Sequence, residues 1–139
     1  MTAPAASEPH VAAVVTAADT ALQALPTPRH AYNGTRPDLD TACAVVYAGP
    51  GLASGPLGDR FADLQITFQV TAVGTGPEQA LYIADAVKAA LLATPAPAVT
   101  GRAVWPLWQT GEQPVQRDDT VQPALYIATA QYSMKSNPA

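Results

Sequence analysis

The stretch Asp63–Val73, which reads DLQITFQVTAV, decides the fold because apolar and polar residues alternate strictly from Asp63 to Ala72. A period of two over this length predicts a long β-strand with one buried face and one polar face. Strands of this one-sided kind are typical of antiparallel sheets. The predicted buried residues are Leu64, Ile66, Phe68, Val70 and Ala72, and the predicted polar face holds Asp63, Gln65, Thr67, Gln69 and Thr71.

A helix is predicted directly after this strand, over the sequence EQALYIADAVKAALLA at residues 78–93. Thr75 and Glu78 have the spacing of a capping box, and Pro77 falls in the first turn, where its missing N–H does no harm. The stretch TPAPA at residues 94–98 ends the helix. The apolar stripe of this helix comprises Ala80, Ile83, Ala84, Val87 and Leu91.

A second helix is predicted near the start of the chain, where Ser7 is a suitable N-cap and Pro9 falls in the first turn. This helix ends before the prolines at residues 26–28, and a turn-rich connection with a tight turn at Asn33-Gly34 follows at residues 29–40. Its apolar residues recur at helical spacing and are Val11, Val14, Val15, Ala18, Leu22 and Leu25.

Three further segments are predicted to be extended. Residues 42–48 form a short strand of small and β-branched residues, and residues 124–134 form a final alternating strand. Residues 99–108 form an extended piece that Pro106 interrupts, which indicates a strand edge or a bulge. The sequence GPGLASGPLGD at residues 49–59 is too rich in Gly and Pro for regular structure and predicts a mobile loop.

Two strands before the second helix and two after it give the order α-β-β-α-β-β. This order predicts an α+β fold, in which a mainly antiparallel four-stranded sheet carries two helices packed on one face. Residues 8–134 are predicted to form a single domain. A disordered lead at residues 1–7 precedes it, and a frayed tail at residues 135–139 follows it.

The composition argues against a nucleic-acid-binding surface and favours an oligomer. The 139-residue chain has a formal net charge of -4, and only 13% of its residues are charged, whereas a basic patch marks a nucleic-acid-binding surface. Leu, Ile, Val and Phe together make up about 20% of the chain, at the lower edge of the globular range. We therefore expect partner subunits to supply part of the stability.

The N-terminal stretch and the hydropathy predict neither secretion nor a membrane. No apolar run reaches the length of about 18 residues that a membrane span needs. The N-terminus lacks the basic region of a signal peptide, and Asp19 interrupts the apolar stretch that follows. We expect a protein that is made in the cytoplasm and binds no membrane.

Few residues indicate chemistry. Cys43 is the only cysteine, which excludes an intrachain disulfide and a CxxC motif, and the apolar run around it predicts a buried position. His10 and His30 are the only histidines, and neither has an acid or a cysteine at metal-ligand spacing. The sequence therefore predicts no catalytic residue, no metal site and no cofactor.

Candidate contact residues follow residue 104 instead. Trp105 and Trp108 flank a proline, and two interpretations remain open: they are core residues, or they are anchors of a protein–protein interface. In an extended chain, Arg117 and Asp119 point to one side and Asp118 to the other. This arrangement predicts an ion pair within the loop or between subunits rather than an active site.

Two longer stretches carry a resemblance to a known family. They are ITFQVTAVGTGPEQALYIADAVKAALLA, which starts at Ile66, and GRAVWPLWQTGEQPVQRDDTVQPALYIATAQYSM, which starts at Gly101. Together they resemble tail terminator proteins, also called tail completion or minor tail proteins, of siphophages that infect actinobacteria. The resemblance covers residues 59–139. The Gly/Pro-rich loop at residues 49–58 departs from it, so no family role is carried onto that loop.

The resemblance implies a structural virion protein without catalysis or a cofactor. Such a protein forms a ring, hexameric by this resemblance, on the head-proximal end of the tail tube, where it stops tube polymerisation and presents a new face to the head. The implied partners are further copies of the chain, the major tail tube protein and the head–tail connector proteins. The implied location is the virion, which is assembled in the cytoplasm of the bacterial host.

Within such a ring, two sets of residues are candidates for contact with other subunits or with the tube. Trp105, Trp108, Arg117, Asp118 and Asp119 are the first set. The polar positions of the long strand are the second set, and they face the lumen, a neighbouring subunit or plain solvent. Those positions are Asp63, Gln65, Thr67 and Gln69.

Two alternatives to a tail terminator remain. One is another ring component of the head–tail connector, an adaptor or a stopper, which the same order of elements suits equally well. The other is a small dimeric α+β enzyme or ligand-binding domain. This second alternative predicts a sizeable apolar cavity against the sheet with convergent polar groups.

Overall fold

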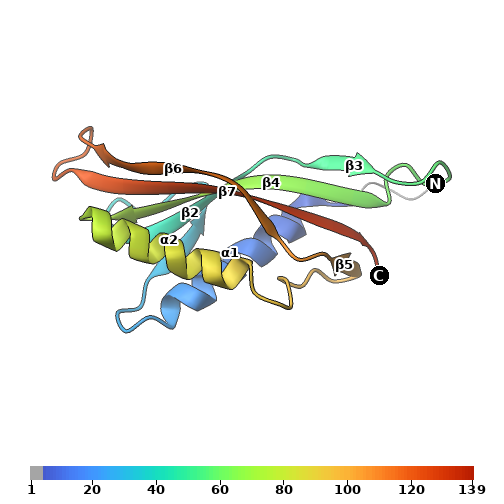
Figure 1. Ribbon diagram of the computed structural model, residues 1–139, viewed down its shortest axis with the longest axis horizontal. Coiled ribbons are helices and arrows are strands. Elements are labelled where there is room, and N and C mark those ends of the chain that lie inside the picture. Colours follow the sequence, from blue (N-terminus) through green and yellow to red (C-terminus); the bar gives the residue numbers. More distant parts are fainter. Residues whose placement is uncertain (1–4) are drawn as a thin grey trace.

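The computed structural model describes residues 5–139, which form two helices and seven strands (Figure 1). The helices are α1 (Ser7–Gln23) and α2 (Pro77–Leu91). The strands are β1 (His30–Asn33), β2 (Cys43–Ala48), β3 (Leu52–Ser54), β4 (Asp63–Gly74), β5 (Arg102–Val104), β6 (Trp108–Asp118) and β7 (Leu125–Pro138).

The long strand predicted from the alternation is β4, and it lies inside one mixed sheet. β7 pairs antiparallel with it, from Leu64 opposite Ser136 to Gly74 opposite Tyr126. The path through the sheet is β1-β2-β4-β7-β5, with β3 also paired to β4 and β6 also paired to β7. β1 runs parallel to β2, while the other described pairings are antiparallel. The predicted α+β class is confirmed.

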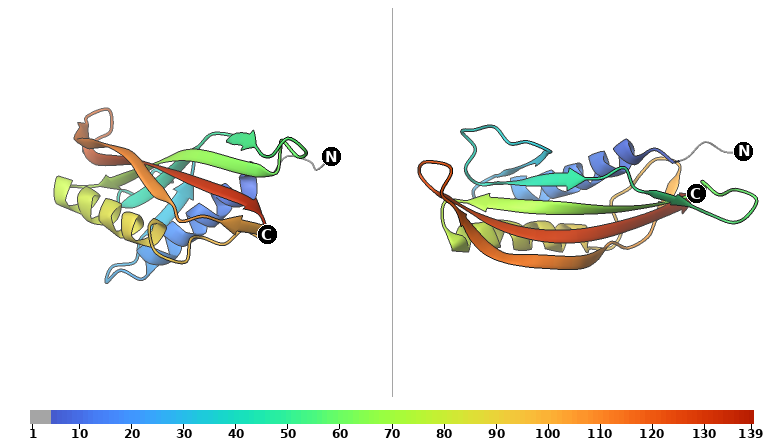
Figure 2. Two further views of the ribbon diagram at one scale, coloured as in Figure 1. Left: turned by 45° about the vertical axis from the view of Figure 1, so that its right-hand side comes forward. Right: turned by 90° about the horizontal axis from the view of Figure 1, so that it is seen from above.

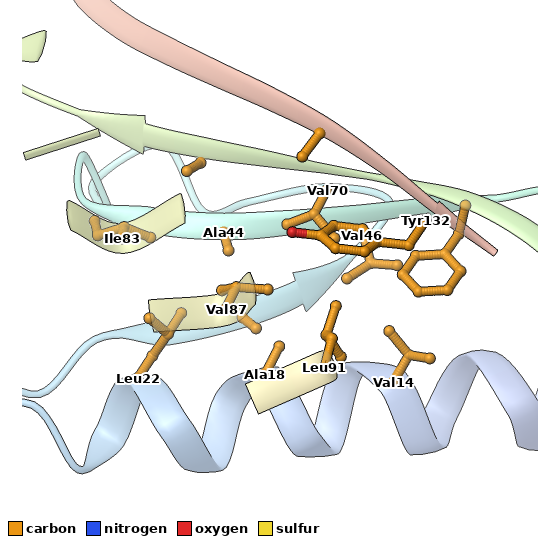
Figure 3. Packing of buried hydrophobic residues seen from close by; sticks show 14 of the residues in the cluster. Val14, Ala18, Leu22, Ala44, Val46, Val70, Ile83, Val87, Leu91 and Tyr132 are labelled. Atoms are coloured by element: carbon orange, nitrogen blue, oxygen red, sulfur yellow. The ribbon is translucent and has the colours of Figure 1, made fainter. Parts of the chain in front are cut away.

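Both helices pack against one face of the sheet, as predicted (Figures 1 and 2). The five apolar residues of β4 are all buried in the core that the helices cover, so the predicted alternation is confirmed. Figure 3 shows how side chains from both helices meet Val70 and Tyr132 of the sheet. The helical residues facing this core recur every three or four positions and are Val14, Ala18, Leu22, Ala80, Ile83, Val87 and Leu91.

The junction between β4 and α2 brings a strand end very close to the first turn of a helix. A Cβ atom at Gly74 would lie 2.7 Å from the backbone nitrogen of Ala80, which is closer than real Cβ contacts. Only glycine therefore allows this approach. The short junction lays α2 back along β4 and β7, against the buried face of the sheet.

The start of α2 differs from the predicted capping box. The helix begins at Pro77 with Gly76 as its N-cap, and no side chain caps it. Because Gly76 is the cap, the third helical residue is Gln79 and not Glu78. Gln79 Oε1 accepts hydrogen bonds from the N–H of Thr75 at 2.8 Å and from its hydroxyl at 3.0 Å. The predicted pairing of Thr75 with Glu78 is therefore wrong.

The prediction of a four-stranded sheet is wrong, because the sheet has seven strands. β1 lies in the connection predicted to be turn-rich, β3 lies in the loop predicted to be irregular, and the piece at residues 99–108 divides into β5 and the start of β6. The sequence of β6, WQTGEQPVQRD, is polar and contains a proline. Its pairing with β7 shifts register twice, and the second shift, between Gln113 and Gln116, leaves Pro114 out of the paired positions.

The chain ends inside the sheet. β7 continues to Pro138, and β5 pairs antiparallel with its last three residues, beginning with Arg102 opposite Pro138. The predicted frayed tail at residues 135–139 is therefore wrong. At the other end, α1 begins at Ser7 with Ala6 as its N-cap, so Ser7 is not the cap. The predicted disordered lead falls partly on residues 1–4, which lie outside the described residues.

We predict that Leu22→Ala lowers the free energy of unfolding by about 2–5 kcal/mol, because Leu22 is fully buried and its loss leaves a cavity between α1 and the sheet. Urea denaturation of both proteins measures this change. The control is Leu57→Ala, which removes the same side chain from a position that is 96% exposed. This control changes stability by less than about 0.5 kcal/mol, and equal losses in the two variants would contradict the described core.

Candidate functional site

The face of the sheet that the helices leave uncovered is the candidate functional surface, and we call it the open face (Figure 2, right). It consists of alternate residues of β4 and their cross-strand partners in β7. Most of these residues are neutral and end in an amide or a hydroxyl group. The cross-strand pairs are Gln65–Lys135, Thr67–Ser133, Gln69–Gln131 and Thr71–Thr129.

Hydrogen bonds connect several of these polar side chains. Gln65 Nε2 donates to Ser133 Oγ at 3.4 Å, and Gln69 Nε2 donates to Thr71 Oγ1 at 3.2 Å. Ser133 Oγ donates in turn to the carbonyl oxygen of Ile66 at 3.3 Å, which satisfies this buried hydroxyl. The open face therefore presents partly ordered amide and hydroxyl groups, which suit hydrogen bonding to another protein.

Large aromatic side chains lie on the open face. Trp108 lies opposite Ser133 and Tyr47 lies opposite Gln69, so both side chains point out of this face. Trp108 is 39% exposed, Tyr47 is 46% exposed and Trp105 is 49% exposed, so none of them is a core residue. Aromatic side chains beside neutral polar groups are enriched in the central parts of protein interfaces.

Trp105 is held beside the open face by three contacts with the end of β7. Its backbone N–H donates to the carbonyl oxygen of Lys135 at 2.9 Å, and its indole Nε1 donates to Asn137 Oδ1 at 2.8 Å. The Lys135 ammonium lies 4.8 Å from the ring centroid, in a cation–π contact. The indole is therefore ordered before any partner arrives, which reduces the entropy that binding costs.

The Arg-Asp-Asp stretch does not form one cluster. Arg117 Nε lies 2.7 Å from Asp119 Oδ1, so the ion pair predicted within the loop is present, and both side chains are exposed. Asp118 points to the open face, where it lines a hollow together with Arg36. The hydroxyl and the N–H of Thr120 donate to Asp118 Oδ1 at 2.5 and 3.0 Å, and these hydrogen bonds lower the pKa of the carboxyl group.

The structure brings most of the predicted contact residues together. Arg117 is an exception because it lies opposite Tyr126, which packs against the main core, and Asp119 stays beside Arg117. Their role in contacts stays a prediction. Tyr47 is not among the predicted contact residues, although it follows the buried run of β2 and is an exposed aromatic residue. The predicted residues on or beside the open face are Asp63, Gln65, Thr67, Gln69, Trp105, Trp108 and Asp118.

A buried polar network, which the sequence does not predict, lies on the other side of the sheet. His10 Nε2 lies 2.7 Å from Ser136 Oγ, and His10 Nδ1 lies 2.7 Å from the carbonyl oxygen of Ala6. Arg102 Nε donates to the same Ser136 Oγ at 3.1 Å, and Arg102 Nη2 donates to the carbonyl oxygen of Ala62 at 2.7 Å. Four segments that are far apart in the sequence meet here, so no local sequence pattern predicts the contact.

The serine and the histidine of this network have the spacing of a nucleophile and its general base. Yet Ser136 is 0% exposed and His10 is 2% exposed, so a substrate cannot reach either side chain in this structure. Ser136 Oγ is also occupied by the Arg102 guanidinium. The network therefore ties α1 to the ends of β5 and β7 and has the character of a structural contact.

Burial lowers the pKa of His10, and the nearby positive charge of Arg102 acts in the same direction. The hydrogen bond to the Ala6 carbonyl oxygen opposes both effects. The neutral imidazole fits the network, with Nδ1–H donating to Ala6 and Nε2 accepting from the Ser136 hydroxyl. A protonated imidazole would need Ser136 Oγ to accept from two cations at once.

The described residues show no further cluster of reactive or metal-binding side chains. Within residues 5–139 no helix is long and apolar enough to cross a bilayer, and no three His, Cys, Asp or Glu side chains gather as a metal site needs. A hollow of about 700 Å³ lies between α1 and the loop at residues 97–100, and we call it the α1 groove. Its lining is mostly Ala and Pro, and Glu8 is its one charged residue.

The fold and the open face define an α+β protein with one sheet face covered by helices. The opposite face is partly open, because Cys43, Val45, Val73 and Leu125 form a small second core at one end of it. No model of a known protein family matches the sequence, and no curated protein matches it either. Among solved structures, the chain is similar to a chain in the virion of a native gene transfer agent particle. The TM-score is 0.61 at 17% identity, and the match covers 91% of this chain and 96% of that chain. This likeness shows a shared fold.

We predict that acid destabilises the protein through His10. Because the pKa of His10 is lowered in the folded state, the unfolded chain binds the proton first as the pH falls. The stabilisation is complete above pH 6.5, the ordinary value for histidine, and is lost as the pH falls below it, at up to about 1.4 kcal/mol per pH unit. Chemical denaturation between pH 8 and pH 5 measures this slope.

The matched variant for this experiment is His10→Gln, which keeps a polar side chain but does not titrate. Its stability at pH 8 is lower than that of the wild type, and the difference between the two proteins shrinks toward pH 5. Parallel pH profiles for the two proteins would show that His10 does not carry the acid sensitivity.

Proposed function

We propose that this chain is a structural protein of a phage-like virion. It forms a closed ring, hexameric by the family resemblance, that caps the head-proximal end of a tail tube, ends tube polymerisation and joins the tube to the head connector. The observation that carries the proposal is the shared fold with a virion chain over 91% of this chain. The open face supports it, because a structural protein needs a large surface for its neighbours.

The chemistry of the open face favours a protein partner. A phosphate backbone needs several free Lys or Arg side chains. Here Lys135 lies over the Trp105 ring, and Arg36 Nη1 faces three carbonyl oxygens of its own loop. The remaining amides, hydroxyls and half-exposed aromatic rings match a protein surface. We assign this face to the major tail tube protein.

The edges of the sheet support a role in ending a polymer. A free strand edge is a template for the addition of another chain. At one edge, β6 is interrupted by two register shifts and Pro114, which lacks the N–H that a ladder needs. At the other edge, β1 has only four residues and packs beside α1. Both edges resist strand addition, so a further layer of tube would have to bind through a face.

A protein that ends a tube must also form a closed ring. A head-to-tail contact closes a ring when the rotation per subunit divides the circle, and it forms a filament otherwise. A cap must bind its neighbours laterally and the tube on one face, while its opposite face rejects another tube layer. We assign Arg117 and Asp119 to a lateral contact because they point away from the open face.

We predict that Arg117→Ala weakens ring assembly and leaves the folded subunit intact, because the Arg117 side chain is 60% exposed and its ion pair is with the nearby Asp119, which is 70% exposed. Size-exclusion chromatography with light scattering measures the oligomer, and thermal unfolding measures the subunit. The control is Lys88→Ala, which removes a similar exposed pair, Lys88–Asp85 on α2. Oligomers that are unchanged in Arg117→Ala relative to this control would remove Arg117 from the contact.

We further predict the phenotype of particles made without this protein. Tails are overlong or fail to join heads, because nothing ends the tube or connects it. Electron microscopy of particles from a producing strain that lacks the gene measures tail length and the joined fraction. Unjoined tails of normal length would instead assign the chain to a neighbouring adaptor or stopper ring, and normal joined particles would refute both roles.

A further inference from the structure

The loop between β1 and β2 exposes a leucine almost completely. Leu39 is 97% exposed and lies in a turn closed by a hydrogen bond from the N–H of Asp40 to the carbonyl oxygen of Pro37 at 3.0 Å. An isolated apolar side chain on a flexible loop would need no explanation. This loop, however, is held in place by a dense set of polar contacts.

Arg36 and Tyr32 fix the shape of the loop. Arg36 Nη1 lies 3.2, 3.3 and 3.0 Å from the carbonyl oxygens of Pro37, Asp38 and Asp40. The Tyr32 hydroxyl donates to Asp40 Oδ2 at 2.5 Å, and this hydrogen bond raises the pKa of Tyr32 to about 12. The loop therefore presents Leu39 as an ordered knob and loses little entropy when the side chain is covered.

The α1 groove is a shallow, open hollow whose polarity suits such a side chain. It lies along one flank of α1, where Ala12, Ala13 and Ala17 are small, next to Pro97 and Ala98 of the loop before β5. Its volume of about 700 Å³ accommodates a leucine together with part of its turn. Its lining is chiefly apolar, so an entering leucine leaves water for an apolar surface.

The knob and the groove lie toward opposite ends of the long axis of the chain. Figure 1 and the right view of Figure 2 both place the β1–β2 connection at one end and the α2–β5 connection, which borders the α1 groove, toward the other. A chain therefore cannot fill its own groove with its own Leu39. A second copy that follows head to tail can fill it.

We propose that Leu39 of one subunit inserts into the α1 groove of the next subunit in the ring. Each chain carries one knob and one groove. In a closed ring, every subunit therefore has its knob buried in one neighbour and its groove filled by the other. The proposal rests on the proposed ring, for which it supplies the lateral contact. The open face stays free for the tube.

A directed disulfide tests the proposed contact. We introduce Leu39→Cys into one preparation and Ala13→Cys into another, mix the two and add a mild oxidant. We expect a rapid interchain disulfide in the mixture and only slow, collisional linking in either preparation alone, because position 39 meets position 13 only across the contact. The native Cys43 does not interfere, since it is fully buried and burial raises the pKa of its thiol to about 12.

The matched control mixes Leu57→Cys with Ala13→Cys, because Leu57 is as exposed as Leu39 but lies in a different loop. Random collision links both mixtures at the same rate, whereas docking makes the 39–13 link at least about tenfold faster by raising the local concentration. Equal rates overturn the proposal. A chain that carries both substitutions, Leu39→Cys and Ala13→Cys, gives a ladder of linked species that ends at the closed ring.

The variant Leu39→Ser tests the same contact without disulfide formation. It weakens self-association about ten- to hundredfold, as expected for a leucine that leaves an apolar site, and leaves the melting temperature of the subunit unchanged. Rings that persist in Leu39→Ser, together with equal linking rates in the two mixtures, would overturn this contact while leaving the ring function intact. Normal particles without the protein would overturn the ring function itself, so the two failures are distinguishable.

Discussion

Eleven consecutive residue pairs join β4 to β7, from Leu64 opposite Ser136 to Gly74 opposite Tyr126, and the other elements depend on this ladder. Side chains in a strand point alternately to the two faces, so the register decides which residues are buried. A slip of one residue would move Ile66 and Phe68 to the open face and bring polar side chains against the helices. The stacking of Phe68 on Tyr132, at 5.7 Å between ring centroids, favours the observed register.

The ladder is closed at its far end by the network around Ser136. His10 brings the first turn of α1 to this point, and Arg102 brings β5 and the residue before β4. A buried polar group is costly when it loses its partner, so removing any member leaves the others unsatisfied. The covered side of the sheet is thus fixed both by apolar packing and by this polar corner.

Sequence patterns predicted the elements whose local signal is strong and missed those defined by distant contacts. The alternation around Phe68 identified β4, and helical spacing identified both helices. The sequence does not predict β6, because Pro114 and its polar neighbours are typical of a loop. Only pairing with β7 makes this segment a strand. The sequence predicts a frayed tail at Ser136, because the partner that holds this residue, His10, lies 126 residues away. The open face is predicted only in part, because the alternation identifies its polar positions in β4 but not Tyr47.

The core of this chain buries little apolar area, while several large apolar side chains stay exposed on its surface. Alanine fills much of the helix faces, as at Ala18 and Ala80, so the helices lie close to the sheet but bury little apolar area per residue. Other apolar side chains, such as Trp108 and Leu39, stay outside although burial would stabilise them. A chain that withholds apolar groups from its core gains stability when neighbours cover them. In the proposed ring, that gain comes through faces and loops, because the strand edges resist pairing.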